Sequence, residues 1–281
     1  MTEACDLTAL QARRLIGNKS LSPVELVDSC VARISLVNPV LNAMVAACYD
    51  RARNEAKAAE KAVLQGDRLG PLHGLPLGVK DLNVTEGVRT TFGSELHAEF
   101  VPAQDERIIA DLRRAGAIVL GKTNTPEFGA GANTTNRVYG PTGNPFDPAR
   151  ICGGSSGGSA VALACGMVPL ATGSDTGGSL RTPASFCGIT SHRGTPGLVP
   201  SDRRTIGLST YSVQGPMART VDDAALMLSV MAGDSSIDPL SGPVDASSFA
   251  DLPAVDLSQL KVAWSTDLGV APVDQKIAEI F

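Results

Sequence analysis

A long stretch rich in glycine, serine, threonine and proline, from about Asn124 to Thr195, constrains the fold of this chain more than any other feature. The stretch is neither repetitive nor strongly charged, and it contains the apolar runs AVALAC and MVPLAT. Apolar runs of this kind favour tight loops joined by short buried elements over a flexible linker, and functional groups gather on such loops. We therefore expect a glycine-rich functional region inside a folded domain.

Short apolar runs alternate with a helical pattern before this stretch. LPLGVKD (75–81) and GAIVLGK (116–122) are rich in apolar and β-branched residues and contain or begin with glycine, which is typical of buried strands. DERIIADLRRAG (105–116) has helical periodicity and ends on a glycine. The alternation predicts an α/β protein with a mainly parallel or mixed sheet.

The first sixty or so residues are predicted to be helical. In SLSPVELVDSCVARI, Ser22 can cap a helix, Pro23 suits its first position, and Glu25 follows the cap by three residues. Apolar residues then recur at helical spacing. A second helix, rich in alanine, is predicted from about Val40 to Leu64.

The C-terminal segment predicts one strand and the start of one helix. LKVAWS (260–265) has the pattern of a strand, and PVDQKIAEIF (272–281) begins a helix that stops after about two turns without a cap. A helix of that length is marginal by itself. We therefore expect the chain to be truncated at its C-terminus relative to a longer protein.

Composition narrows the class of protein. The chain has 281 residues, of which 43% are hydrophobic and 19% charged, as expected of a packed globular protein. A net charge of −5 gives no general attraction to nucleic acid or to anionic membranes, and no apolar run reaches the ~18 residues that span a bilayer. The acidic start MTEACDLTAL lacks the pattern of a secretory signal. These features predict a cytoplasmic protein with a small-molecule or peptide partner.

The cysteines and histidines do not favour a structural zinc site. Six cysteines are scattered without a Cys-x-x-Cys pair, and there are three histidines. Reduced cytoplasmic thiols are therefore the expectation.

The segment from Gly116 to Thr123, GAIVLGKT, fits the phosphate-binding pattern G-x-x-x-x-G-K-T. In that motif the residues between the glycines form an open turn, and a helix starts at the lysine. Here the intervening AIVL is itself the predicted strand, and NTPE follows. We therefore reject nucleotide binding at this motif.

A second pattern, GGSSG from Gly153 to Gly157, fits the nucleophile elbow G-x-S-x-G of α/β-hydrolases. That mechanism needs an acid and a histidine later in the chain. His192 is the one histidine that follows Ser155, and Asp175 is the one acid between them. A further C-terminal part could supply another histidine, so a Ser-His-Asp site stays open as an alternative.

A third interpretation joins three separate segments. Lys80 follows an apolar strand, GGSSGG supplies Ser155 and Ser156, and GSDTGGSLRTP supplies Ser179 behind two glycines. A lysine in an apolar setting loses hydration, which lowers its pKa and lets it act as a base. A serine hydroxyl needs such a base nearby. The backbone N–H groups of TGGS are suited to holding an oxyanion.

These segments together resemble the amidase signature family of serine amidohydrolases. The resemblance rests on LHGLPLGVKD, on the block from GGSSGG through GSDTGGSLRTPASFCG and on VQGPMARTVDDAALML, with TNTPEF and GPTGNPFDP between them. Their order and spacing match the family: Ser155 lies 75 residues after Lys80, and Ser179 lies 24 after Ser155. The resemblance covers nearly the whole chain.

The resemblance implies roles for three residues. Ser179 would be the nucleophile, Ser155 a bridging serine that relays protons, and Lys80 the base. In this family a cis peptide bond precedes the bridging serine, here Gly154–Ser155. No metal or organic cofactor is required by such a mechanism.

Further positions follow from the same resemblance. The N–H groups of Thr176, Gly177, Gly178 and Ser179 would hold the oxyanion, and Gly129 matches a position near the acyl pocket. The remaining candidates are supports of the two glycine loops, with an ordinary cap and ion pair as the alternative explanation: Ser156, Asp175 and Arg181. Cys152 and Cys187 flank the motifs, and we interpret them as small buried fillers.

The implied fold is a mixed β-sheet surrounded by α-helices. We expect one domain over 1–281, with a helical segment at about 1–65 and the catalytic core at about 66–281. The implied partner is a small-molecule amide, with no nucleic acid and no membrane, and the chain is compatible with a homodimer.

The implied activity is hydrolysis of a carboxylic amide to an acid and ammonia or an amine, and two alternatives stay open. One is the glutaminase subunit of a tRNA-dependent amidotransferase, which typically has glutamine after the arginine and a stretch LKPTYG. This chain has Thr182 and SHRGTPGLVP there, which favours a free-standing amidase. The other is a truncated, non-catalytic member of the family that acts as a binding protein.

Overall fold

A six-stranded mixed sheet organises the chain in the computed structural model, which describes residues 3–204 and 206–280. The strand order is β1-β3-β2-β6-β8-β7. β2 is parallel to both β3 and β6, whereas the pairs β1–β3, β6–β8 and β7–β8 are antiparallel. The strands are β1 (Met44–Ala47), β2 (Pro76–Lys80), β3 (Ile118–Thr123), β6 (Leu170–Asp175), β7 (Thr190–Ser191) and β8 (Val213–Ala218).

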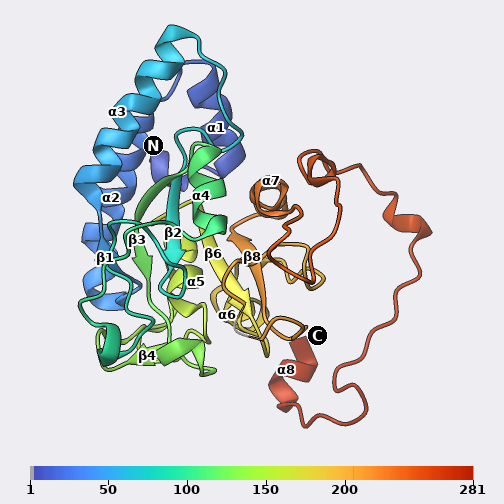
Figure 1. Cartoon of the computed structure of the whole chain (residues 1–281). Helices are drawn as coiled ribbons and strands as arrows, with labels where there is room; N and C mark the ends of the chain where they lie inside the picture. The colour runs from blue at the N-terminus through green and yellow to red at the C-terminus, as the bar shows by residue number, and fades with distance from the viewer. Residues whose placement is uncertain (1–2, 205, 281) are drawn as a thin grey trace. The chain divides into compact units, whose positions relative to one another are not determined.

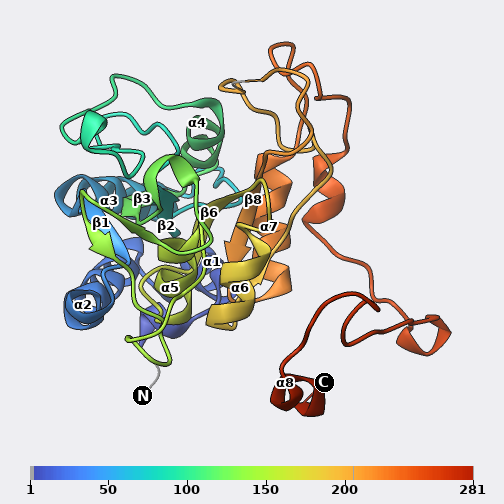
Figure 2. The same ribbon diagram turned by 90° about the horizontal axis from the view of Figure 1, so that it is seen from below.

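Helices cover this sheet, as Figure 1 shows. α5 contacts β2, β3, β6 and β8, α3 contacts β3, and α7 contacts β8. In Figure 2, α5 and α6 lie below the strands and α4 lies above them. The helices are α1 (Ala9–Gly17), α2 (Pro23–Leu41), α3 (Tyr49–Gln65), α4 (Arg107–Arg114), α5 (Gly157–Ala164), α6 (Arg181–Cys187) and α7 (Val221–Met231). A separate two-stranded sheet pairs β4 (Thr135–Asn136) with β5 (Gly140–Pro141).

The predicted start of α2 is confirmed. The hydroxyl of Ser22 accepts the N–H of Val24 at 2.9 Å, and the side chain of Glu25 accepts the N–H of Ser22 at 2.9 Å. This reciprocal capping satisfies backbone donors that a helix start leaves free. Pro23 occupies the first turn, as expected.

The helix predicted from Val40 to Leu64 is wrong over its first part. α2 runs on to Leu41, and Asn42 adopts the left-handed conformation that ends it. The side-chain oxygen of Asn38 accepts the N–H groups of Ala43 and Met44, both at 2.8 Å. The chain then enters β1, an edge strand on β3, before α3 begins. A local hydrogen-bonding side chain and pairing with a distant strand override the helical pattern.

The buried elements around the glycine-rich stretch agree with the sequence. β2 and β3 are buried at every residue, and the lysine of GAIVLGKT lies within β3, where a phosphate-binding turn would need an open loop. The run AVALAC belongs to α5, whose residues 157–163 are all buried. It is therefore a buried helix that begins close to Ser159, as predicted.

Two compact units divide the chain, Met1–Asp251 and Leu252–Phe281. In the described part of the second unit, Leu257–Gln259 form a 3₁₀ helix and Gln275–Ile280 form α8, where a helix was predicted. The strand predicted at 260–265 is wrong, since these residues are exposed and outside any strand. A strand needs a neighbouring strand for its hydrogen bonds, and its sequence pattern cannot supply one.

No helix within 3–204 and 206–280 is long and apolar enough to cross a membrane.

Candidate active site

The sheet brings the three predicted segments together at the carboxyl ends of its central strands. β2 ends at Lys80 and its parallel neighbour β6 ends at Asp175, so both side chains lie at the carboxyl ends of adjacent strands. Ligand sites of open α/β sheets form at such ends. Ser155 and Ser156 directly precede α5, which packs under these strands, and Ser179 directly precedes the residues that lead into α6.

Lys80 is fully buried and surrounded by hydroxyl groups. Its Nζ donates to the Oγ atoms of Ser155 at 2.8 Å, Ser156 at 2.8 Å and Ser174 at 2.9 Å. Burial lowers the pKa of Lys80 to about 7, although the negative charge of Asp175 acts in the opposite direction. A lysine that titrates near 7 is available as a neutral base at neutral pH.

The hydrogen bonds around Lys80 Nζ leave Ser155 as one of two hydroxyls that can donate a proton to it. A neutral lysine has two N–H donors and one lone pair, so one of three surrounding hydroxyls must donate to it. The hydroxyl of Ser156 donates to the carbonyl of Ser174 at 3.2 Å, which commits its proton elsewhere. Ser155 and Ser174 remain as donors to the base. The peptide bond Gly154–Ser155 is cis, as the family resemblance implies.

Ser179 approaches this group through its backbone. Its carbonyl accepts the N–H of Ser156 at 3.3 Å, which joins the two glycine loops. Within residues 3–204 and 206–280, no hydrogen bond links its hydroxyl to Ser155 or Lys80. The expected hydrogen bond is therefore formed between Lys80 and Ser155, and none is formed by the Ser179 hydroxyl among the described residues. Hydrogen bonds of a catalytic group are often long in a site without substrate and shorten when substrate binds.

Asp175 fixes the loop that carries Ser179. Its carboxylate accepts the N–H groups of Gly178 at 2.8 Å and Leu180 at 3.1 Å, and Arg181 and Arg193 donate to it at 3.0 and 2.9 Å. Burial raises the pKa of Asp175, but these hydrogen bonds and the charge of Arg181 outweigh burial and hold the pKa well below its usual range. Asp175 and Arg181 therefore lie where supports of the loop were expected.

One expected oxyanion donor is already occupied. The Gly178 N–H points to Asp175, so it is not free to bind an oxyanion. The N–H groups of Thr176, Gly177 and Ser179 have no hydrogen-bond partner among the described residues. A Cβ at Gly177 would meet no atom within 4 Å, so this part of the loop is open.

Three residues at the site were not identified from the sequence: Thr172, Ser174 and Arg193. Thr172 and Ser174 lie on one face of β6, and their hydroxyls accept the N–H and the Nζ of Lys80, both at 2.9 Å. Two polar residues at a spacing of two in a buried strand were the available signal. Arg193 binds Asp175 from a later segment of the chain. The sequence contains no pattern that links these two residues.

Gly129 lies beside the bridging serine. A Cβ built on it would be 3.5 Å from Ser155 Oγ and 2.6 Å from Leu82 Cδ1, and its φ of +70° is strained for any other residue. The expected role of Gly129 near an acyl pocket stays a prediction.

We expect Gly129→Ala to lower the free energy of unfolding by ~1–3 kcal/mol, because it adds backbone strain and a contact with Leu82. Gly66→Ala is the matched control, since Gly66 has a φ of +77° and a Cβ added there would meet no atom within 4 Å. It should cost ~1 kcal/mol. Denaturant unfolding of both variants measures the difference, and equal losses would show that the contact with Leu82 costs nothing.

The histidine alternative finds no support in the geometry. His192 is exposed, and in the described part of the chain no hydrogen bond joins its ring to Ser155 or Asp175. The carboxylate of Asp175 is taken by two arginines and two backbone N–H groups.

Cys152 and Cys187 are both buried. Burial raises the pKa of the Cys152 thiol to about 11 and that of the Cys187 thiol to about 12. These thiols stay protonated at neutral pH, which fits small buried fillers and not nucleophiles.

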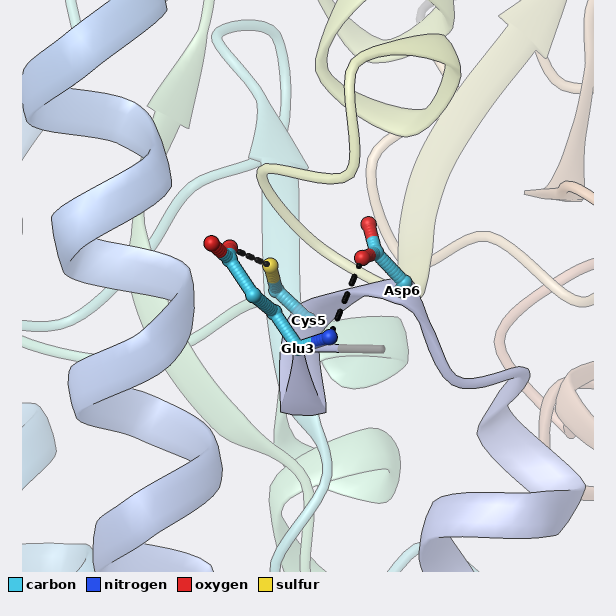
Figure 3. A group of neighbouring side chains, drawn as sticks. All are labelled: Glu3, Cys5 and Asp6. Atoms are coloured by element: carbon cyan, nitrogen blue, oxygen red, sulfur yellow. Dashed lines mark hydrogen bonds between the residues drawn. The ribbon is translucent and has the colours of Figure 1, made fainter. Parts of the chain in front are cut away.

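One cluster of acidic and thiol groups has the spacing of metal ligands. Figure 3 shows Glu3, Cys5 and Asp6, whose ligand atoms all lie within 4.8 Å of one another. Glu3 and Asp6 cap a 3₁₀ helix, and Arg33 Nη2 binds Glu3 at 2.9 Å and Asp6 at 3.1 Å. The arginine compensates both carboxylates, and the cap and ion pairs account for the cluster. We assign no metal to it.

A cavity of about 470 Å³ opens next to the buried lysine. Ser174 and Thr176 line it, and so do Phe92, Glu106 and Gln214. The cavity lies next to Ser174, which accepts a hydrogen bond from Lys80, and next to the backbone N–H of Thr176, which is unpaired among the described residues. This position makes it the candidate substrate pocket.

Comparison with known sequences identifies relatives along nearly all of the chain. The sequence profile of the amidase family matches residues 25–281. An acylamidase from Rhodococcus erythropolis is 40% identical over 276 residues, which are 98% of this chain and 57% of that protein. The A subunit of the glutamyl-tRNA(Gln) amidotransferase of Chloroflexus aurantiacus is 41% identical over 262 residues, 93% of this chain and 54% of that protein. The chain thus spans about half the length of these curated relatives.

Solved structures show the same fold. A bacterial aryl acylamidase of the amidase signature enzymes superposes with a TM-score of 0.80 at 36% identity, covering 85% of this chain and 50% of that one. The peptide amidase of Stenotrophomonas maltophilia gives a TM-score of 0.77 at 31% identity, covering 89% and 51%. The expected mixed sheet surrounded by helices is thereby confirmed.

Proposed function

Because this chain belongs to the amidase family, the amidase signature enzymes, we propose that it hydrolyses a carboxylic amide through an acyl-enzyme on Ser179. The observation that carries the proposal is the buried Lys80, whose Nζ lies 2.8 Å from Ser155 Oγ and whose pKa burial lowers to about 7. A base of this kind is what a serine nucleophile needs at neutral pH.

Acylation starts when Ser179 Oγ attacks the amide carbonyl carbon. Its proton passes to Ser155 Oγ, and the proton of Ser155 passes to the lone pair of Lys80 Nζ. The N–H groups of Thr176 and Gly177 stabilise the negative oxygen of the tetrahedral intermediate. When the C–N bond breaks, Ser155 gives a proton to the leaving nitrogen and takes one back from Lys80.

Deacylation uses the same groups in the same order. A water molecule attacks the ester carbonyl while Ser155 and Lys80 accept its proton. Collapse of the second intermediate breaks the bond to Ser179 Oγ, which is reprotonated through Ser155, and the acid leaves. In both steps Ser156 and Ser174 hold Nζ in place.

The choice between a free-standing amidase and a glutaminase subunit depends on details of the sequence. The relatives include an acylamidase and one component of an amidotransferase at nearly equal identity, so identity alone does not separate the two. Thr182 and the segment 191–200 depart from the pattern of the glutaminase subunit, and this departure supports a free-standing amidase. The alternatives remain a non-catalytic binding protein or a glutaminase subunit.

The test is ammonia release from a panel of aliphatic amides, aromatic amides and glutamine. A free-standing amidase releases ammonia from simple amides, whereas a glutaminase subunit prefers glutamine. The assay is run on this chain and on a form extended at its C-terminus, because the relatives are about twice as long. Release from no amide by either form would favour the binding protein.

The pH dependence of hydrolysis gives a direct prediction about Lys80. Below its pKa of about 7 the side chain is protonated and cannot accept a proton. We expect kcat/KM for an uncharged amide to rise about tenfold per pH unit below that value and to level off above it. A pH–rate profile from pH 5 to 10 measures this. A profile that falls across neutral pH would contradict a neutral lysine as the base.

A further inference from the structure

Gln214 lies in the cavity wall directly beside the candidate active site. It belongs to β8 and is in register with Ser174 of β6, whose hydroxyl accepts a hydrogen bond from Lys80. Gln214, Ser174 and Thr176 line the same cavity. The side chain of Gln214 is therefore well placed to contact a bound substrate.

A chain of hydrogen bonds runs from Lys80 toward Gln214. The backbone N–H of Lys80 donates to Thr172 Oγ1 at 2.9 Å, and Thr172 Oγ1 donates to Asn83 Oδ1 at 2.8 Å. A hydroxyl has one proton, and Thr172 gives that proton to Asn83. The amide oxygen of Asn83 therefore faces Thr172, and its amino group must face the opposite way.

The amino group of Asn83 has two acceptors. Its Nδ2 donates to Glu106 Oε1 at 2.5 Å and to Gln214 Oε1 at 2.9 Å, which uses both protons. Glu106 is held in turn, because its Oε2 accepts the N–H of Val84 at 2.9 Å. Asn83 and Glu106 are both buried. The order of donors and acceptors in this series of hydrogen bonds thus leaves a single orientation for the amide of Gln214.

Gln214 must turn its oxygen to Asn83 and its amino group away. In the opposite orientation, two N–H donors would face each other inside the protein. Nε2 of Gln214 has no hydrogen-bond partner in the described part of the chain. Buried Lys122 steadies the arrangement, since its Nζ donates to the backbone oxygen of Asn83 and to Thr85 Oγ1.

We propose that Gln214 is a specificity-determining residue that donates a hydrogen bond from Nε2 to a second carbonyl oxygen of the substrate, distinct from the scissile carbonyl. The inference rests on the proposed function, because it assigns the substrate of that same site. The substrate class is an amide with another uncharged carbonyl, such as an oxo-amide. Apolar Phe92, Val199 and Ile206 line other parts of the cavity and suit the carbon chain between the two carbonyls.

A substrate without the second carbonyl is expected to bind more weakly, with a higher dissociation constant. Binding removes water from Nε2, and a methylene group offers no acceptor in return. A neutral hydrogen bond of this kind corresponds to about tenfold in affinity. The discrimination should therefore appear as a ratio of dissociation constants between matched ligands.

The experiment measures binding in the Ser179→Ala chain, in which acylation cannot occur. Ligand-observed NMR gives the dissociation constants of hexanamide and of 3-oxo-, 4-oxo- and 5-oxohexanamide, which differ only in the second carbonyl and its distance from the amide. The same titrations are made after adding Gln214→Met, which removes the donor at similar volume. Adding Gln65→Met instead gives the matched control, since Gln65 is exposed at the end of α3.

At least one oxo-amide should bind about tenfold more tightly than hexanamide, and Gln214→Met should bring that ratio close to one. Gln65→Met should leave it unchanged. A second variant, Gln214→Glu at pH 8, keeps an oxygen for Asn83 and replaces the donor by a carboxylate, so it should also abolish the preference if Gln214→Met fails to fold.

Ratios near one for every oxo-amide in the Ser179→Ala chain would overturn the proposal, and so would a preference that survives both Gln214 variants. These ratios are read without turnover. A failure of the proposed hydrolysis would instead appear as absent ammonia release from the chain with Ser179 intact, so the two failures are distinguishable.

Discussion

Replacing Ser179 with alanine is expected to abolish acylation of the protein. The hydroxyl is the proposed attacking atom, so its removal takes away the covalent step. We expect kcat to fall roughly 10⁴-fold or more, which is the size of effect seen when a covalent nucleophile is removed. Binding of an amide should persist, because the cavity is unchanged.

The measurement is intact-protein mass after reaction with a serine-directed phosphonate, combined with ammonia release from the best amide of the panel. Ser35→Ala serves as a matched control, since within the described residues its hydroxyl binds only the backbone oxygen of Val31 in its own helix. Phosphonate labelling that persists in Ser179→Ala at the wild-type rate would refute Ser179 as the nucleophile.

Removing Lys80 or Ser155 is expected to slow acylation by about 10²–10⁴-fold, because each change breaks the path that takes the proton from Ser179. Lys80→Ala should equal or exceed the defect of Ser155→Ala, since Lys80 is the final acceptor. The double variant should be little worse than the worse single variant. Two residues that act as one unit cannot each contribute a full, independent effect.

Rates of acyl-enzyme formation in the two single variants and the double variant test this unit. His192→Ala is the control for the alternative mechanism, and it should retain nearly the wild-type rate because no hydrogen bond joins its ring to the site in the described residues. A loss in His192→Ala as deep as that in Ser179→Ala, with Lys80→Ala near wild type, would replace the lysine mechanism by a histidine one.

The sequence determined much of the local structure and named two residues of the candidate site that the structure brings into contact. Capping by Ser22 and Glu25 uses residues three apart, so their pattern is readable without any tertiary contact. The buried strands β2 and β3 and the helix α5 also agree with their sequence patterns. Motif order and spacing named Lys80 and Ser155, which lie in contact.

Tertiary structure decided which groups are free and which are already bonded. Nothing in TGGS shows that the Gly178 N–H is taken by Asp175, and nothing near Arg193 shows that it binds the same carboxylate. The order of strands places Ser174 opposite Gln214, which lies 40 positions later in the sequence. Pairing between strands also converts residues 44–47 from the predicted helix into β1.

The physical reason is the range of the interactions. Caps, helix faces and strand alternation depend on residues a few positions apart, so a sequence pattern specifies them directly. A hydrogen-bond donor can be assigned only when all its neighbours are known, and those neighbours come from strands brought together by folding. The sequence therefore named Lys80 and Ser155, and the packed sheet decided that Ser155 contacts Lys80, that the Gly178 N–H is occupied and that Gln214 turns its amide oxygen to Asn83.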